Sequence, residues 1–370
     1  MELLIFDMDG VLLKPLGYHL ALKETVRLAG LSSGVGELFL TDAQISQFEA
    51  LGISSEWHSS ALCMAVMVLQ KNGEAIRDTN PAKLFNRTLD DLFVEIERLP
   101  MKQPALKRGL AATEILATKF DHSEDSVRAL VENSVSIEES QTMNWFQELI
   151  LGSVEYKKTY KKEPQFHQES FLKIFDQRLI NESAAEKINH LALKDGYGAA
   201  IMTNRPSNGL PGFDGAPDAK MGAALVGLET IPLIGNNEMS WLAKETSKDI
   251  GEMLKPSWVH ALAAILVASG WSLCNSLDFV RQDRNALHLN NLFHLQDSSI
   301  TVFEDTPGGL VAVQEAGNLL IENGLRVKIQ KIGIGEDVNK KEALSSQGAM
   351  VYSNINQALN SLDNFRIFFS

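Results

Sequence analysis

Two carboxylates that stand two residues apart near the N-terminus are the strongest chemical signal in the chain. Asp7 and Asp9 follow the apolar run 3–6, and Gly10 comes directly after them. A short apolar run of this kind is typical of a buried parallel strand, and open α/β sheets bind ligands at the carboxyl ends of such strands. One carboxylate could act as a nucleophile and the other as a general acid and base. A turn or an incidental pair of surface acids would give the same pattern, so further motifs are needed to distinguish these interpretations.

A second apolar run also ends in residues that suit phosphoryl chemistry. The run 198–202 is followed by Thr203 and Asn204. A hydroxyl group and a backbone N–H at the end of a strand are well placed to hold a phosphoryl oxygen. The same dipeptide is also common in turns, so this motif alone is a weak signal.

A lysine and a further pair of acids follow later in the chain. Lys255 precedes the predicted helix 257–269, where the positive end of the helix dipole favours an anionic partner, either a carboxylate or a bound phosphate. An exposed lysine without a role is the alternative. The run 300–303 ends in Glu304 and Asp305. Beside Asp7 and Asp9, these carboxylates would form a hard-oxygen site suited to Mg²⁺.

The bulk composition is that of a globular protein large enough for two domains. The chain has 370 residues, of which 45% are hydrophobic and 22% charged, and its formal net charge is −13. This charge disfavours binding to nucleic acid or to an anionic membrane, although a local lysine and a metal ion could still attract an anionic substrate. Cys63 and Cys274 are expected to be buried thiols in a reducing compartment. No signal peptide and no membrane span is predicted, which favours a cytoplasmic protein.

The elements that must position these residues fall into two regions. A predicted all-α domain at 16–184 interrupts an α/β domain made of 1–15 and 185–370. Within the insert, the run 59–70 is apolar almost all round, which predicts the central helix of a bundle. Its other predicted helices are 18–29, ending at Gly30, and 41–51, 89–98, 105–120, 123–134 and 143–151. The α/β part should add helices 183–194 and 356–363, a helix-to-strand stretch 223–234, strands 326–332 and 349–352, a long loop 207–222 and an irregular insert 271–298.

A lysine-rich segment at 156–162 permits two interpretations. At helical spacing Lys157 shares a face with Lys161, and Lys158 shares one with Lys162. The segment could guide an anionic substrate towards the site, but a solvated helix face is the favoured interpretation.

Taken together, the motifs DMDGV, MTN, LKP and FEDTPGG resemble the haloacid dehalogenase superfamily. The resemblance covers roughly residues 1–15 and 185–370. It implies a Rossmannoid, doubly wound parallel α/β core with an inserted all-α cap domain. The sequence of the insert matches nothing that we can name, although its place after the first motif is that of the family's helical cap.

The resemblance also implies a role for each matching residue. Asp7 would be the nucleophile that becomes phosphorylated, with one oxygen on Mg²⁺. Asp9 would protonate the leaving alcohol and later deprotonate the attacking water, while its carbonyl binds the metal. Thr203 and the Asn204 N–H would hold the phosphoryl oxygens, and Lys255 would neutralise Asp7 and the phosphoryl group.

The remaining implied positions concern the metal and the substrate. Asp305 would bind Mg²⁺ directly, with Glu304 in or just outside the coordination shell. Arg205 and the lysines at 157–162 are candidates for contact with the phosphate or the leaving group. Closure of the cap would exclude water until it is needed for attack.

The expected function is that of a Mg²⁺-dependent phosphatase acting on a small phosphorylated metabolite, such as a sugar phosphate or another organophosphate. Halide displacement does not use a second acid at the position of Asp9, and ion-transporting members usually carry threonine there, so both branches are disfavoured. A phosphomutase of the same superfamily needs the same core and stays open. A non-catalytic protein that binds a phosphoryl ligand is the alternative from a different class.

Overall fold

In the computed structural model the chain divides into two units. One unit comprises Met1–Pro15 and Asp176–Ser370, and the other comprises Leu16–Phe175. The second boundary lies at Asp176, earlier in the chain than the expected residue 185. The structure describes residues 1–53, 55–71, 80–100, 105–122, 124–210, 215–282, 284 and 289–362.

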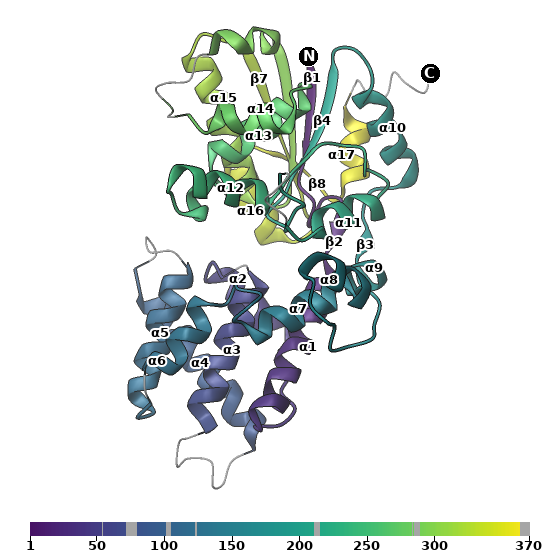
Figure 1. Cartoon of the computed structure of the whole chain (residues 1–370). Coiled ribbons are helices and arrows are strands. Elements are labelled where there is room, and N and C mark those ends of the chain that lie inside the picture. Colours follow the sequence, from purple (N-terminus) through teal and green to yellow (C-terminus); the bar gives the residue numbers. More distant parts are fainter. Residues whose placement is uncertain are drawn as a thin grey trace. The chain divides into compact units, whose positions relative to one another are not determined.

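The first unit is built on a parallel sheet of six strands (Figure 1) in the order β5-β4-β1-β6-β7-β8. Consecutive parallel strands need crossover connections, and these are supplied mostly by helices. The strands are β1 (Glu2–Phe6), β4 (Tyr197–Met202), β5 (Leu233–Ile234), β6 (Ser298–Glu304), β7 (Val327–Ile334) and β8 (Met350–Tyr352).

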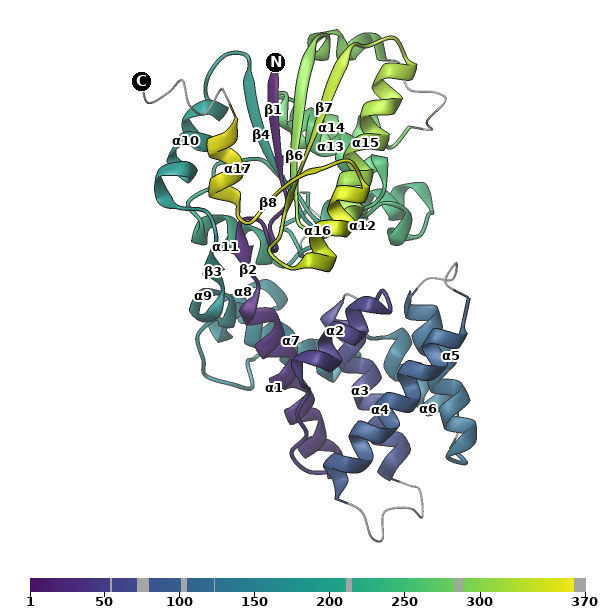
Figure 2. The ribbon, with the colours of Figure 1, turned by 180° about the vertical axis from the view of Figure 1, so that it is seen from behind.

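Both faces of this sheet are covered by helices (Figures 1 and 2). One face carries α13 (Trp258–Ala268) and α15 (Pro307–Glu322), and the other carries α10 (Glu182–Ala192) and α17 (Ile355–Ser361). The side chains of β1 alternate between the two cores, with Leu3 and Ile5 on the α13 side and Leu4 and Phe6 on the α10 side. Burial on both faces explains why this strand is apolar at every position. The predicted doubly wound α/β core is confirmed.

The remaining elements of this unit connect or extend the sheet. A small antiparallel pair joins β2 (Leu13–Lys14) to β3 (Gln177–Arg178), the points at which the chain leaves and re-enters this unit. The others are α11 (Asp218–Leu225), α12 (Asn236–Thr246), η2 (Ile250–Glu252), α14 (Leu273–Val280), η4 (Leu289–Leu295) and α16 (Val338–Ser346).

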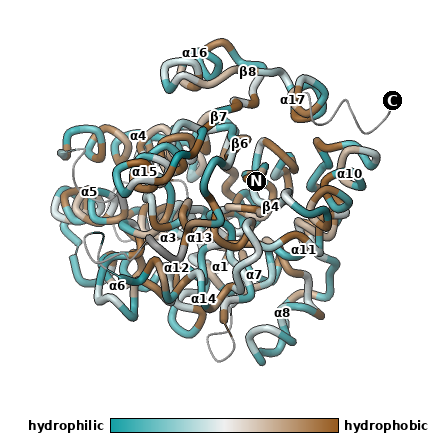
Figure 3. Tube along the Cα trace, turned by 90° about the horizontal axis from the view of Figure 1, so that it is seen from above, coloured by the Kyte–Doolittle hydropathy of each residue, from teal (hydrophilic) through white to brown (hydrophobic). Residues whose placement is uncertain are grey.

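The centre of the sheet fixes where the chemistry lies. β1 pairs with β4 on one side and with β6 on the other, with Phe6 opposite Ile201 and Phe303. The rings of Phe6 and Phe303 stack with their centroids 4.7 Å apart. The backbone N–H of Asp7 then donates to the carbonyl of Phe303 over 2.9 Å. The residues that follow β1, β4 and β6 therefore emerge at one edge. Figure 3 shows the apolar stretches of β4 and α13 close together within this unit.

The second unit consists of helices. Its central element is α3 (Glu56–Lys71), which contacts α1, α4, α5, α6 and α7 and buries Leu62, Val66 and Leu69 completely. The predicted central helix of a bundle is confirmed. The other helices are α1 (Leu16–Ser33), α2 (Asp42–Ala50), α4 (Pro81–Arg98), α5 (Ala105–Lys119), α6 (Glu124–Glu132), α7 (Gln141–Leu151), α8 (Ser153–Tyr160) and α9 (Phe171–Phe175).

Several local expectations were wrong. The first long helix continues past Gly30 to Ser33. The expected loop 207–222 contains the start of α11, and the expected irregular insert 271–298 contains α14 and η4. Cys63 is buried as expected, but Cys274 is exposed because it lies on the outer face of α14.

Some residues of the predicted helices 123–134 and 356–363, the loop 207–222 and the insert 271–298 lie outside the described part of the chain, namely 123, 211–214, 283, 285–288 and 363. No helix within the described part of the chain is both long enough and apolar enough to cross a bilayer.

Candidate active site

A buried lysine bridges two carboxylates at the carboxyl edge of the central strands. The ammonium of Lys255 lies 2.6 Å from Oδ1 of Asp7 and 2.7 Å from Oε1 of Glu304. The three side chains are 7%, 9% and 0% exposed, respectively. The anionic partner that the sequence predicted for Lys255 is therefore a pair of carboxylates.

The local fold explains how Lys255 reaches this position. The residue precedes α13, whose first turn is capped by the hydroxyl of Ser257, and the peptide bond between Lys255 and Pro256 is cis. The helix begins at Trp258, one residue after the predicted start, and Pro256 stands before the cap. The dipole of α13 opposes a nearby cation, and the two carboxylates offset that cost.

Burial and the proximity of the acids to one another shift the pKa values of this cluster. Burial raises the pKa of Glu304 well above its ordinary value, the nearby charge of Asp7 raises it further, and the Lys255 ammonium opposes both effects. Burial works to lower the pKa of Lys255, but the charges of Asp7 and Glu304 outweigh burial and hold that pKa above its ordinary value. Lys255 therefore stays charged. Its single positive charge does not neutralise both acids, so the site still favours the binding of a cation.

A second lysine lies at the next acid. Nζ of Lys340, from α16, is 2.5 Å from Oδ2 of Asp305. Burial, followed by the charge of Asp7, raises the pKa of Asp305 to about 6, and Lys340 opposes the shift. The sequence did not point to Lys340 as a site residue. Its place shortly after the end of β7, the strand beside β6, is the signal that could have found it.

The acid cluster has the composition of a site for a hard divalent cation. Ligand atoms of Asp7, Glu304 and Asp305 all lie within 4.8 Å of one another. Carboxylate oxygens at this spacing can converge on Mg²⁺ or a similar ion. The two ammonium groups already drawn to these oxygens show that the site attracts positive charge. The residues present therefore fit a metal, although they do not identify it.

Two glycines leave room for these carboxylates. A Cβ on Gly10 would lie 2.0 Å from Oδ2 of Asp305, and Gly10 has φ of +73°, a conformation that favours glycine. A Cβ on Gly309, at the start of α15, would collide with the carboxylate of Glu304. The hydroxyl of Thr306 donates to Glu304 over 3.4 Å and forms no side-chain cap on α15.

The end of β4 supplies the remaining expected groups. Thr203 is 1% exposed, and its Oγ1 accepts the backbone N–H of Arg205 over 3.1 Å. Its backbone N–H donates to Ile234 in the sheet. Asn204 is exposed at the same edge. The phosphoryl-binding roles of Thr203 and Asn204 stay predictions.

Asp9 is held by an arginine. Nε and Nη2 of Arg205 lie 2.6–3.0 Å from the two carboxylate oxygens of Asp9, and Nη2 also lies 2.9 Å from Oδ2 of Asp176. The Arg205 side chain is 2% exposed, whereas that of Asp9 is 36% exposed. Phosphate binding by Arg205 stays a prediction, but in this structure its guanidinium faces carboxylates. No sequence pattern pointed to Asp176 as a partner.

The lysine-rich segment has acidic neighbours of its own. Lys157 pairs with Glu163, Lys158 with Glu155 and Lys162 with Glu138. These pairs weaken the local positive field, which agrees with a solvated surface. The predicted shared helix faces are wrong, because α8 ends at Tyr160 and Lys161 has a left-handed backbone conformation. Guidance of a substrate by this segment stays a prediction.

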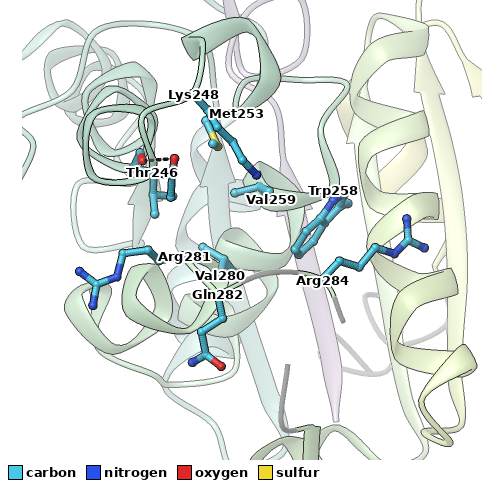
Figure 4. Close-up of a pocket in the computed structure, with 10 residues that line it drawn as sticks. Thr246, Lys248, Met253, Trp258, Val259, Val280, Arg281, Gln282 and Arg284 are labelled. Carbon is cyan, nitrogen blue, oxygen red and sulfur yellow. Dashed lines mark hydrogen bonds between the residues drawn. The ribbon is translucent and has the colours of Figure 1, made fainter. Parts of the chain in front are cut away.

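A cavity of about 470 Å³ lies elsewhere in the same unit (Figure 4). Its lining includes Lys248, Met253, Trp258, Arg281 and Arg284, and none of the acid cluster. In Figure 4 the two arginine side chains point outwards on opposite sides. They pair with acids on α12, α14 and α15.

Comparison with known proteins adds evidence on the fold alone. No protein-family model matches the chain, and no curated protein matches it. The crystal structure of a Northeast Structural Genomics Consortium target, ZR25, aligns over 98% of this chain and 99% of its own, with a TM-score of 0.64 and 15% identity. Phosphatase Tt82 from Thermococcus thioreducens aligns over 93% of this chain and 99% of its own, with a TM-score of 0.48 and 12% identity. The first likeness shows a shared fold, and the second is too weak to support an argument.

Proposed function

We propose that this protein is a Mg²⁺-dependent phosphatase of the haloacid dehalogenase type, which hydrolyses a small phosphorylated metabolite through a phosphorylated Asp7. The observation that carries the proposal is the contact of Lys255 with both Asp7 and Glu304, at 2.6 and 2.7 Å. It joins a buried carboxylate to a fixed positive charge at the sheet edge where a ligand is expected to bind.

The first half of the reaction transfers the phosphoryl group to the protein. An oxygen of Asp7 attacks phosphorus, and the bond from phosphorus to the substrate oxygen breaks. Asp9 donates a proton to that leaving oxygen, so an alcohol departs. Lys255 offsets the negative charge that Asp7 and the phosphoryl group bring together, and this charge is highest on the equatorial oxygens.

The second half returns the protein to its starting state. Asp9, now a carboxylate, takes a proton from water as the water oxygen attacks phosphorus. The bond between phosphorus and Asp7 breaks, which releases inorganic phosphate and restores the Asp7 carboxylate. Thr203 and the N–H of Asn204 would hold phosphoryl oxygens during both halves.

The metal would be held by Asp7, Asp305 and the backbone carbonyl of Asp9, with Glu304 in or beside the coordination shell. When bound, Mg²⁺ would supply further positive charge to the phosphoryl oxygens. The support for this assignment is the group of three carboxylates, together with the raised pKa values of Glu304 and Asp305.

The substrate class rests on the family resemblance. A helical insert after the first motif is the cap arrangement of members that act on small molecules, so we expect a sugar phosphate or another small organophosphate. Efficient dephosphorylation of a folded phosphoprotein would contradict this expectation.

Phosphate release from a panel of phosphorylated metabolites and an aryl phosphate, with and without Mg²⁺, tests the proposal. Wild type is compared with Asp7→Asn and Asp9→Asn, and with Asp195→Asn as a control at an exposed acid of the same unit. We expect metal-dependent release that both site variants abolish and the control retains. Phosphorylation of Asp7 by a sugar bisphosphate without net release of phosphate would favour a phosphomutase. Absence of both reactions would favour a phosphoryl-binding protein.

A further inference from the structure

Arg205 forms ion pairs with both Asp176 and Asp9, and so links Asp176 to the proposed general acid and base. The guanidinium contacts both oxygens of Asp9 and, through Nη2, the carboxylate of Asp176. Asp176 is 0% exposed in its side chain and Arg205 is 2% exposed, whereas Asp9 is 36% exposed. The network is therefore buried at Asp176 and exposed to solvent at Asp9.

Three separate parts of the fold bring this network together. Asp9 follows β1, and Arg205 follows β4, the neighbouring strand. Asp176 directly precedes β3, which pairs with β2 just after the loop that carries Asp9. The backbone of α11 closes this side, because a Cβ on Gly222 would lie 3.3 Å from Nη1 of Arg205 and 2.7 Å from Sδ of Met8.

The difference in burial decides which partner can move. Separating Arg205 from Asp176 would leave a charged side chain buried without its counter-ion, which is strongly unfavourable. Separating Arg205 from the half-exposed Asp9 costs less, because water can solvate the released carboxylate. Arg205 is thus anchored, and Asp9 is the end of the chain that can move.

We propose that Arg205 and Asp176 are positioning residues, which hold the Asp9 carboxylate at the edge of the site for proton transfer. Arg205 then acts on the reaction through Asp9 and makes no contact with the phosphoryl group. This inference rests on the proposed function, since it assigns Asp9 the role of acid and base. The geometric part of the inference is that Asp176 fixes the position of Arg205 and Arg205 fixes that of Asp9. This part does not depend on catalytic activity.

Two aryl phosphates of similar shape separate this role from phosphate binding. The p-nitrophenolate ion leaves readily without a proton, whereas the phenolate ion depends more on proton transfer. We expect Asp176→Ala and Arg205→Lys to lower kcat/KM for phenyl phosphate about ten times more than kcat/KM for p-nitrophenyl phosphate, because kcat/KM reports the first transfer. Asp176→Asn, which retains an acceptor for Arg205, should keep the wild-type ratio. In the Asp9→Asn background, where only the first transfer takes place, neither substitution should alter the ratio of the two single-turnover rates of phenol release further. Asp195→Asn is the control.

Crystal structures of Asp176→Ala and Asp176→Asn supply a readout that needs no turnover. We expect Asp9 and Arg205 to leave their positions in the alanine variant and to keep them in the asparagine variant, which retains an acceptor. Unmoved side chains in the alanine variant would overturn the positioning role. An equal loss of kcat/KM on both substrates would overturn the catalytic part. A wild type that cleaves neither ester would overturn the proposed function, while the crystal structures would still decide the positioning role.

Discussion

The ammonium of Lys340 lies 2.5 Å from Oδ2 of Asp305, on a carboxylate that the proposed metal would also use. Asp305 is 15% exposed and Lys340 is 35% exposed. The lysine can therefore withdraw into solvent at small cost, whereas the carboxylate cannot. In the metal-free protein this lysine offsets part of the negative charge of the cluster.

Removal of this lysine should strengthen metal binding. Lys340→Met deletes a cation that competes for Asp305 and repels a divalent ion, so we expect Mg²⁺ to bind about tenfold more tightly. Calorimetric titration of the metal into the apoprotein measures the change. Lys341→Met, at the next residue of α16, is the matched control. Weaker binding by Lys340→Met would mean that the lysine supports the metal site and does not compete with it.

Lys255 should matter for both catalysis and stability. Lys255→Ala leaves the buried carboxylates of Asp7 and Glu304 facing each other without their common counter-ion. We expect kcat to fall by about a hundredfold or more, and the free energy of unfolding of the metal-free protein to fall by about 3 kcal/mol. Chemical denaturation and steady-state rates provide the two readouts. Unchanged stability would show that the contact contributes little to the folded state.

Gly10 should resist the smallest substitution. Gly10→Ala places a methyl group 2.0 Å from Oδ2 of Asp305 at φ of +73°. Gly196→Ala is a close control, because it has φ of +82° with no atom within 4 Å of the added Cβ. Both variants carry the backbone strain, but only Gly10→Ala should lose metal affinity and activity. Equal effects of the two substitutions would assign the loss to strain alone.

The buried His260 should make the fold sensitive to acid. Burial, with the Lys255 charge adding to it, lowers the pKa of His260 to about 3. An unfolded histidine titrates near 6.5, so below that pH the unfolded chain takes up a proton that the folded protein excludes. The contribution to stability is present above about pH 6.5 and is lost as pH falls towards 3.

Between pH 7 and pH 5 this loss amounts to about 2 kcal/mol. Denaturation of wild type and His260→Gln at both pH values measures it, because groups common to both proteins cancel. We expect the variant to lose about 2 kcal/mol less than wild type over this interval. An identical loss in the two proteins would contradict the burial of a neutral imidazole.

The sequence located the cluster because its residues follow regular signals. Asp7 and Glu304 each end an apolar strand, and parallel strands bring their carboxyl ends to one edge whatever the length of chain between them. Lys255 could be expected near an anion because a cation at a helix start is unfavourable alone. These arguments depend on strand direction and helix polarity, which are readable from residue patterns.

Asp176 could not be predicted in this way, and for Lys340 the end of β7 indicates the sheet edge but not the residue. Asp176 precedes a strand of only two residues, which is too short to leave a periodic pattern. Lys340 reaches Asp305 because α16 directs the Lys340 side chain towards the edge of the sheet. The apolar residues of α16 show little helical periodicity, so the sequence does not indicate which face of this helix is turned inwards. Arg205 was noticed, but its partners depend on the packing of three separate segments.

Detection of a phosphoryl group on Asp7 tests the central claim most directly. With p-nitrophenyl phosphate, the Asp9→Asn variant should complete the first transfer, which needs little proton donation, and then stall for lack of a base. Acid quenching and mass spectrometry of the peptide that contains Asp7 should reveal the phosphoryl group. The signal should require Mg²⁺ and should disappear in Asp7→Asn combined with Asp9→Asn. Metal-dependent phosphate release by wild type, with no phosphoryl group ever found on Asp7 and full activity in Asp7→Asn, would contradict the account.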